Sequence, residues 1–172
     1  MVERSVLQSF DWRTLVEAKR ELPLLKTGVL AQASTVFPGN PWSGRVPIDA
    51  DAWSAGTLAR AVKSIGASVV SSNYPDITDA LIAAAHAQGL RIMAWAVNDA
   101  PTMASLIDRG VDGLITDYPD VAREVMVRKG IELPRQYASP FDDEVEIDSG
   151  EDEISSDGLD LLRCVAKRNV LA

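Results

Sequence analysis

The stretch GLRIMAWAVNDAPTMASLIDRGVDGLITDYPD, residues 89–120, decides the fold of this chain. It contains two apolar runs, residues 90–97 and 111–115, that are short for helices and almost free of charge. Between them, Asp99 and Pro101 are typical of a helix start, and Gly110 is typical of a helix end. A buried strand, a helix and a second buried strand form a βαβ unit, which requires parallel strands covered on both faces. The stretch therefore predicts an α/β fold with a parallel sheet.

The rest of the chain continues this alternation. Apolar runs predict further strands at residues 5–10, 29–33 and 67–72, and helical spacing predicts helices at 14–22, 54–66, 79–88 and 121–129. Thr78 is expected to cap the helix 79–88, and either Asp51 or Ser54 is expected to cap the helix before it. Residues 37–51, FPGNPWSGRVPIDAD, are rich in Gly and Pro and predict a loop at the carboxyl end of a strand. About five strands alternating with five helices, without a hairpin, are expected.

Length and charge narrow the class of protein. The 172 residues suffice for one sizeable domain but fall short of the roughly 250 residues of a closed (β/α)8 barrel. Of the net charge of −8, residues 136–172 contribute −7, from 10 acidic and 3 basic residues. Residues 1–135 contribute −1, from 15 acidic and 14 basic residues. A nearly neutral body without a basic stripe argues against nucleic-acid binding.

Cysteine content and hydropathy exclude further classes. The single cysteine, Cys164, excludes an internal disulfide and a cysteine zinc site. No apolar run approaches the roughly 20 residues of a membrane span, and the first residues lack the features of a secretory leader. The chain as written is therefore expected to be cytoplasmic.

We expect three regions: a folded domain at residues 1–134, an acidic disordered linker at 135–158 and a short helix at 159–172. Residues 142–157 contain nine carboxylates and no Lys or Arg, so they cannot bury enough apolar surface to offset the entropy of ordering. Helical spacing returns at Leu159, Leu162, Val165 and Ala166. This terminal segment is either a marginal helix on a flexible linker or a peptide that docks on a partner.

Four segments resemble one known family. Residues 6–11 (VLQSFD) are similar to its Ser-Phe strand, and residues 95–99 (WAVND) to its Trp-Thr-Val-Asn strand end. Residues 84–90 (AAHAQGL) and 110–119 (GVDGLITDYP) resemble a helix-to-strand passage and the closing strand of the glycerophosphodiester phosphodiesterase family. The resemblance runs from about residue 6 to residue 127 and concerns the C-terminal half of the family's domain.

The resemblance implies a fold and an activity. It implies parallel (β/α) units that form part of a TIM-type barrel of the PLC-like phosphodiesterase kind, incomplete at the N-terminus. Family members hydrolyse glycerophosphodiesters to glycerol 3-phosphate and an alcohol, using calcium or magnesium and a pair of histidines as acid and base. Those histidines and the metal carboxylates stand on early strands that this chain does not match. The one histidine, His86, falls within a predicted helix, where the family has a histidine away from the chemistry. We therefore expect no catalytic residue, no metal ligand and no cofactor in this chain alone.

The substrate-side wall is the part of the site that the resemblance leaves in this chain. Candidate substrate-binding residues at the carboxyl ends of strands are Phe10, Gln32, Asn73, Trp95 and Asn98. By resemblance, Phe10 and Trp95 form the apolar surface against the glycerol or alcohol group, whereas Asn98 fixes a turn.

Three aspartates are metal-ligand candidates by residue type, but each has a simpler structural role. Asp99 is expected to cap a helix, Asp112 to start a strand, and Asp117 to shape the turn before the last helix.

The main interpretation is part of a phosphodiesterase that is inactive alone and that would act on a glycerophosphodiester once completed. One alternative is a non-catalytic binding or interaction protein that uses the acidic tail and terminal helix, and another is a remnant without function. Unpaired sheet edges would also favour association with other chains. Because complete relatives are often exported, the cytoplasmic location applies to the chain as written.

Overall fold

The computed structural model describes residues 5–44, 46, 48 and 53–133, which fall into two compact units, residues 1–117 and 118–172. Among these described residues, the first unit contains five strands and four α-helices, and the second contains the helix α5 (Pro119–Arg128). The predicted acidic linker and terminal helix lie outside the described residues.

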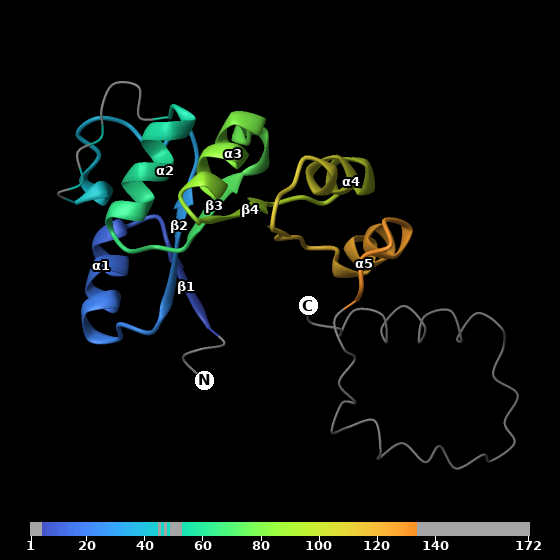
Figure 1. Ribbon diagram of the computed structural model, residues 1–172, viewed down its shortest axis with the longest axis horizontal. Helices are drawn as coiled ribbons and strands as arrows, with labels where there is room; N and C mark the ends of the chain where they lie inside the picture. The colour runs from blue at the N-terminus through green and yellow to red at the C-terminus, as the bar shows by residue number, and fades with distance from the viewer. Residues whose placement is uncertain (1–4, 45, 47, 49–52, 134–172) are drawn as a thin grey trace, which may run out of the picture. The chain divides into compact units, whose positions relative to one another are not determined.

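Strands and helices alternate along the first unit, as the sequence predicts (Figure 1). The strands are β1 (Val6–Ser9), β2 (Lys26–Ala31), β3 (Val69–Asn73), β4 (Arg91–Trp95) and β5 (Gly113–Leu114). The helices are α1 (Trp12–Glu21), α2 (Ala55–Ser64), α3 (Asp79–Ala87) and α4 (Ala100–Asp108). Two short 3₁₀ turns, η2 (Pro41–Ser43) and η3 (Tyr74–Asp76), follow β2 and β3.

All five strands are parallel and lie in the order of the chain, β1-β2-β3-β4-β5. Each connection therefore moves one strand further in the same direction, as in a (β/α) barrel and unlike a doubly wound sheet, where the order reverses. β1 and β5 are the edge strands of this described sheet. The prediction of parallel (β/α) units of a TIM-type barrel is confirmed.

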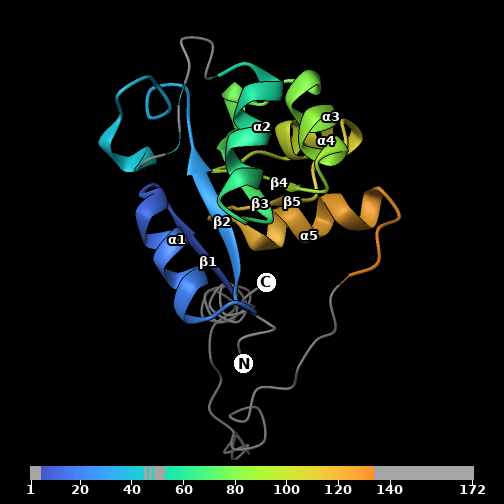
Figure 2. The ribbon, with the colours of Figure 1, turned by 60° about the vertical axis from the view of Figure 1, so that its left-hand side comes forward.

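One face of the sheet is covered by helices. Its fully buried residues include Val29, Ala31, Val70, Ile92 and Ala94. The helices α1, α2 and α3 lie along the strands that they connect, and α2 packs beside α3 (Figure 2). Alternation along each strand points the other set of side chains to the opposite face.

The opposite face holds the side chains that decide the site. Its register pairs Asn73 with Trp95, and Ser71 with Met93. Glycine at position 113 leaves room for Met93, because a Cβ there would lie 2.6 Å from the Met93 sulfur. Asn73, Met93 and Trp95 are partly exposed, whereas Ser71 is fully buried.

Helix caps follow the sequence predictions where they can be compared. The Thr78 hydroxyl accepts a hydrogen bond from the Leu81 N–H at 3.1 Å, and the Asp99 carboxylate accepts one from the Thr102 N–H at 2.9 Å. Ser54 is the N-cap residue of α2 but makes no side-chain capping bond, and Asp51 lies outside the described residues.

Most element boundaries differ from expectation by a few residues, and three of the differences have a clear physical reason. β2 begins at Lys26 instead of residue 29, because its first residues pair with β1. β5 does not begin at residue 111, because the Val111 N–H bonds to the Leu106 carbonyl at the end of α4. α5 begins at Pro119, since proline fits the first turn of a helix, where its missing N–H costs nothing.

Candidate functional site

Phe10 and Trp95 meet at the carboxyl end of the sheet. Their ring centroids are 5.8 Å apart and their planes are close to perpendicular, at 84°. Phe10 directly follows β1 and Trp95 ends β4, so three inter-strand steps separate their strands. On a flat sheet, upright side chains from these strands would stand about 14 Å apart. The contact therefore requires a strongly curved sheet whose concave face bears both rings.

Trp42 is a third ring at this site, and sequence reasoning did not identify it. It lies in η2, 43% exposed, with its ring centroid 6.4 Å from that of Phe10 and its plane tilted by 49°. A large aromatic residue in a Gly- and Pro-rich loop after a strand was the available signal. Its partner could not be read from the sequence because it depends on the path of the loop.

Gln32 and Asn73 end the two middle strands of the candidate wall, and both are half-buried. The Gln32 side-chain amide donates to the Ser34 hydroxyl at 2.9 Å, within its own loop. The Asn73 amide lies 3.5 Å from an Asp76 carboxylate oxygen, which also accepts the Ala33 N–H at 3.0 Å. Asp76 thus joins the loops after β2 and β3. Gln32 and Asn73 lie where these two loops begin.

Asn98 joins the ends of β4 and β5. Its amide nitrogen donates to Asp117 at 2.8 Å, and its carbonyl oxygen accepts from the Thr116 hydroxyl at 3.1 Å and the Asp117 N–H at 3.0 Å. This geometry is that of a turn-fixing residue. Asp117 is accordingly engaged in the same turn.

Two carboxylates at this edge are stabilised in their charged form. Hydrogen bonds from the Arg13 guanidinium hold the pKa of Asp11 below its usual range, and the shortest of them is 2.6 Å. The backbone N–H of Thr102 likewise lowers the pKa of Asp99. Both residues cap helices, at the starts of α1 and α4, where negative charge is favoured.

His86 stands at the opposite end of the sheet. Its Nε2 lies 2.9 Å from Asp112 Oδ2, and the same oxygen accepts the Ile92 N–H at 2.8 Å. Ile92 lies at the start of β4, and Asp112 directly precedes β5. Because the candidate wall lies at the other ends of these strands, His86 tethers α3 to the amino-terminal edge.

A divalent cation requires several hard oxygen ligands held together. Within residues 5–44, 46, 48 and 53–133, no cluster of three or more His, Cys, Asp or Glu side chains could hold a metal ion. Asp99, Asp112 and Asp117 are each engaged at a different place. The described residues therefore do not form a metal site by themselves.

The concave face also holds polar atoms without partners in the described part of the chain. Gln8 Oε1, Ser71 Oγ and Trp95 Nε1 are buried and make no hydrogen bond there. A buried polar group left unpaired costs about 1–3 kcal/mol. These atoms are therefore positions where a ligand or further protein groups would add hydrogen bonds.

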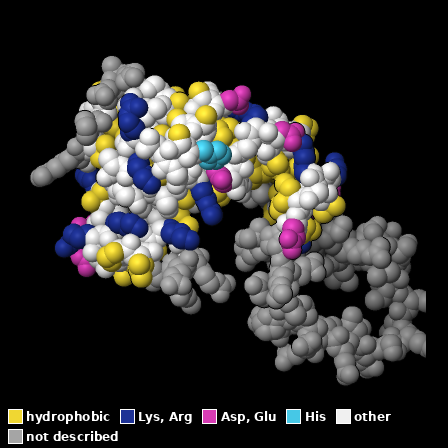
Figure 3. Space-filling model, viewed as in Figure 1, with side chains coloured by type: hydrophobic (Ala, Val, Ile, Leu, Met, Phe, Trp, Pro, Cys, Tyr) yellow, Lys and Arg dark blue, Asp and Glu magenta, His cyan; other side chains and the backbone are white. Residues whose placement is uncertain are grey.

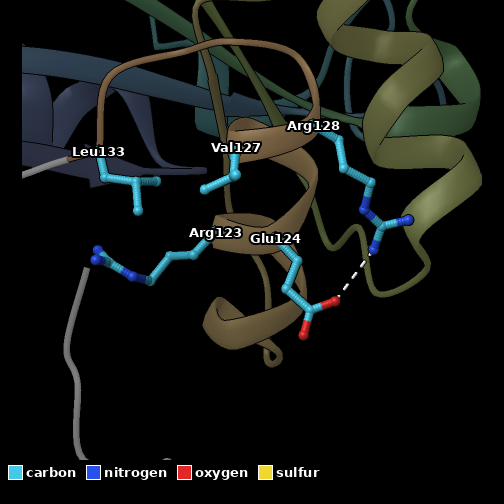
Figure 4. Close-up of a pocket in the computed structure, with 5 residues that line it drawn as sticks. All are labelled: Arg123, Glu124, Val127, Arg128 and Leu133. Carbon is cyan, nitrogen blue, oxygen red and sulfur yellow. Dashed lines mark hydrogen bonds and ion pairs between the residues drawn. The ribbon is translucent and has the colours of Figure 1, made fainter.

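The second unit has a separate hollow of about 390 Å³ over α5 (Figure 4). Its lining consists of Arg123, Glu124, Val127, Arg128 and Leu133, and Arg128 pairs with Glu124 at 3.1 Å (Figure 4). No predicted site residue lies there.

Charge on the visible face and helix hydropathy are further surface features of the described residues. On the face of the first unit shown in Figure 3, Lys and Arg side chains are scattered and do not merge into one basic patch. In the part of the chain that the structure describes, no helix has the length and apolar character needed to cross a membrane.

Comparison with known proteins identifies one family. Residues 2–121 match the model of the Glycerophosphoryl diester phosphodiesterase family. Among curated relatives, a glycerophosphodiester phosphodiesterase from Caldanaerobacter subterraneus is 29% identical over 128 residues, which cover 74% of this chain and 44% of that protein. A Mycobacterium tuberculosis protein assigned as glycerophosphodiester phosphodiesterase 2 is 31% identical, covering 74% of this chain and 46% of that protein.

Solved structures give the same result. A Silicibacter pomeroyi protein assigned as a glycerophosphoryl diester phosphodiesterase aligns with a TM-score of 0.62 at 32% identity, over 78% of this chain and 41% of that one. An Oleispira antarctica phosphodiesterase, solved with sn-glycerol-3-phosphate, shares the fold at 18% identity, with a TM-score of 0.55 and coverage of 71% and 41%. The chain spans less than half the length of the curated relatives it matches.

Proposed function

The chain belongs to the glycerophosphoryl diester phosphodiesterase family, and we propose that it supplies the substrate-side wall of a site that hydrolyses glycerophosphodiesters. The contact between Phe10 and Trp95 is the observation that supports this proposal. It places two aromatic rings at the carboxyl ends of parallel strands, where (β/α) barrels bind their substrates. Phe10 and Trp95 would contact the glycerol or alcohol group, with Gln32 and Asn73 beside them. Asn98 would hold the turn that supports Trp95.

The chemistry of hydrolysis needs groups that this chain does not provide together. Cleavage of a P–O bond by water requires a base for the attacking water and an acid for the departing alcohol oxygen. The sequence holds one histidine, and its ring pairs with Asp112 at the amino-terminal edge. We propose that the acid, the base and their positioning partners come from residues outside this chain, so that the chain alone is inactive.

Family members generally depend on a divalent cation. Calcium or magnesium would be held by carboxylates from outside the described residues, because those described form no cluster of ligands. When bound, such an ion would neutralise negative charge on the phosphate. The residues of this chain would act by orienting the organic part of the substrate.

Complementation tests this proposal. The segment of the Silicibacter pomeroyi protein that this chain does not match would be produced separately and mixed with the chain in calcium or magnesium. The proposal predicts release of sn-glycerol 3-phosphate from glycerophosphocholine by the mixture, with little release by either polypeptide. A folded, soluble mixture without activity would contradict it.

Two variants in the complementation test distinguish a residue of the substrate-side wall from one at the opposite end of the sheet. Trp95→Ala is expected to lower activity at least about tenfold, because the substrate loses an oriented contact surface. His86→Gln should leave activity within about twofold, since His86 lies at the opposite end of the sheet. Loss of activity in His86→Gln with an unchanged unfolding midpoint would show that its imidazole takes part in the reaction.

An interaction role is the second candidate, favoured by the nine carboxylates without Lys or Arg in residues 142–157. In this case, the acidic segment and residues 159–172 engage a basic protein partner. Deletion of residues 142–172 would then abolish capture of that partner and leave the folded unit intact. Capture that is independent of these residues would count against this role.

A further inference from the structure

Three aromatic rings form a corner at the carboxyl edge of the sheet. Phe10 stands between Trp42 and Trp95, at centroid distances of 6.4 and 5.8 Å. The planes meet at 49° and 84°, so the rings do not stack flat on one another. Trp42 is 43% exposed, and Phe10 and Trp95 are partly exposed, so each of the three residues keeps part of its surface open.

The loop that bears Trp42 is held in place by Asn40, which is 7% exposed. The Asn40 carboxamide oxygen accepts the Trp42 N–H at 2.8 Å, and its amide nitrogen donates to the Thr35 carbonyl. The Ser43 hydroxyl donates to the Asn40 carbonyl at 2.8 Å. Trp42 is thus presented on a fixed turn although 43% of it is exposed, and pre-organised aromatic surface of this kind lowers the entropy cost of binding.

The charged side chains that the structure describes at the ends of the strands are acidic. The described residues between the end of each strand and the next helix include Asp11, Asp76, Asp99 and Asp117 but no Lys or Arg. Arg13, in the first turn of α1, is bound through two nitrogens to Asp11 at 2.9 and 2.6 Å. Arg45, in the same loop as Trp42, lies outside the described residues. Such an edge attracts a cation and repels an additional anion.

We propose that Phe10, Trp42 and Trp95 bind the quaternary ammonium group of the substrate's alcohol, so that this chain selects choline-type glycerophosphodiesters. This inference rests on the proposed function, and it adds Trp42 as a specificity-determining residue. A quaternary ammonium has no N–H to donate, so it gains more from π faces than from hydrogen-bond acceptors. The phosphate would lie beyond the corner, toward groups that this chain does not supply.

Binding can be measured on the chain itself, without hydrolysis. The four tryptophans each give one indole N–H signal in a ¹H–¹⁵N spectrum, and single Trp→Phe variants assign them. Choline would be titrated beside ethanolamine and 3,3-dimethyl-1-butanol, which has the shape of choline but no charge. We expect choline to shift the Trp42 and Trp95 signals and to bind about twofold to thirtyfold more tightly than the uncharged isostere.

Matched variants test the role of Trp42. Trp42→Ala should remove most of the preference for choline, whereas Trp42→Phe should retain part of it. Phe37→Ala is the control, because Phe37 is 47% exposed in the same loop and has no ring contact with the corner. The unchanged Trp95 signal in the absence of ligand would show that the Trp42→Ala variant is folded.

Equal binding of choline and 3,3-dimethyl-1-butanol would overturn the inference, as would an unchanged choline preference in Trp42→Ala. An equal loss in Phe37→Ala would also overturn it. These outcomes are independent of the proposed function. A complemented mixture that hydrolyses glycerophosphoglycerol while the chain fails to bind choline would contradict only the inference. Choline binding by a chain that cannot be complemented would contradict only the proposed function.

Discussion

The rings of Phe10 and Trp95 contact each other edge to face, 5.8 Å apart, although their strands are the first and fourth of the sheet. This relationship connects the fold to the candidate site. A sheet wound in one direction, with helices over one face, curves until side chains from non-adjacent strands meet on the other face. The curvature therefore creates the aromatic surface that we assign to substrate binding.

A double-mutant cycle measures this contact. Phe10→Ala and Trp95→Ala should be coupled by about 0.5–1.5 kcal/mol in the free energy of unfolding, as expected for an edge-to-face aromatic pair. Urea unfolding followed by circular dichroism gives the four values required. Phe10→Ala combined with Leu106→Ala, a buried residue of α4, should be additive within about 0.5 kcal/mol. Additivity of the aromatic pair as well would contradict the curved arrangement in solution.

The turn held by Asn98 gives a prediction with a pH dependence. Asn98→Asp replaces an amide that donates to Asp117 with a carboxylate that repels it. We expect a loss of about 1–3 kcal/mol at neutral pH. The loss should shrink as the pH falls below about 4, because the introduced carboxyl then takes up a proton. Thermal unfolding at several pH values measures the difference from the parent chain, and a loss that does not change with pH would argue against this contact.

His86 and Asp112 are predicted to have structural roles and to contribute unequally to the free energy of unfolding. Asp112→Ala removes the acceptor of both His86 and the Ile92 N–H, so it should destabilise the fold by about 1–2 kcal/mol. His86→Ala removes only a partly exposed pair and should cost less than about 1 kcal/mol. Chemical unfolding compares the two variants. A larger loss of unfolding free energy in His86→Ala than in Asp112→Ala would mean that the His86 ring makes stabilising contacts besides its pair with Asp112.

Acid is expected to destabilise the first unit in part through Asp99. Its pKa is lowered in the folded state from an ordinary value of 3.8, chiefly by the Thr102 N–H. The stabilisation is therefore complete above the unfolded pKa and is lost as the pH falls from about 5 through the folded pKa. Asp99→Asn keeps a capping side chain without the charge, so its melting temperature should fall less between pH 6 and pH 3. Parallel melting curves for parent and variant would exclude this contribution.

The order of strands and helices could be predicted because each element has a local signal. Asp99 and Thr78 cap helices as their spacing indicates, and apolar runs mark the buried strands. The start of β5 could not be predicted, because the end of α4 takes the Val111 N–H. The contact of Trp42 with Phe10 could not be predicted either, because it depends on the loop conformation that the Asn40 hydrogen bonds stabilise. Local sequence signals therefore predicted the order of the elements, whereas the candidate site depends on sheet curvature and loop packing.

The assignment of chemistry to residues outside this chain rests on one histidine and no described metal cluster. Its most direct test is ³¹P NMR of glycerophosphocholine incubated with the purified chain in calcium or magnesium. We predict that the substrate signal persists at the rate of a protein-free control. Appearance of sn-glycerol 3-phosphate with the chain alone, abolished by a chelator, would contradict the account.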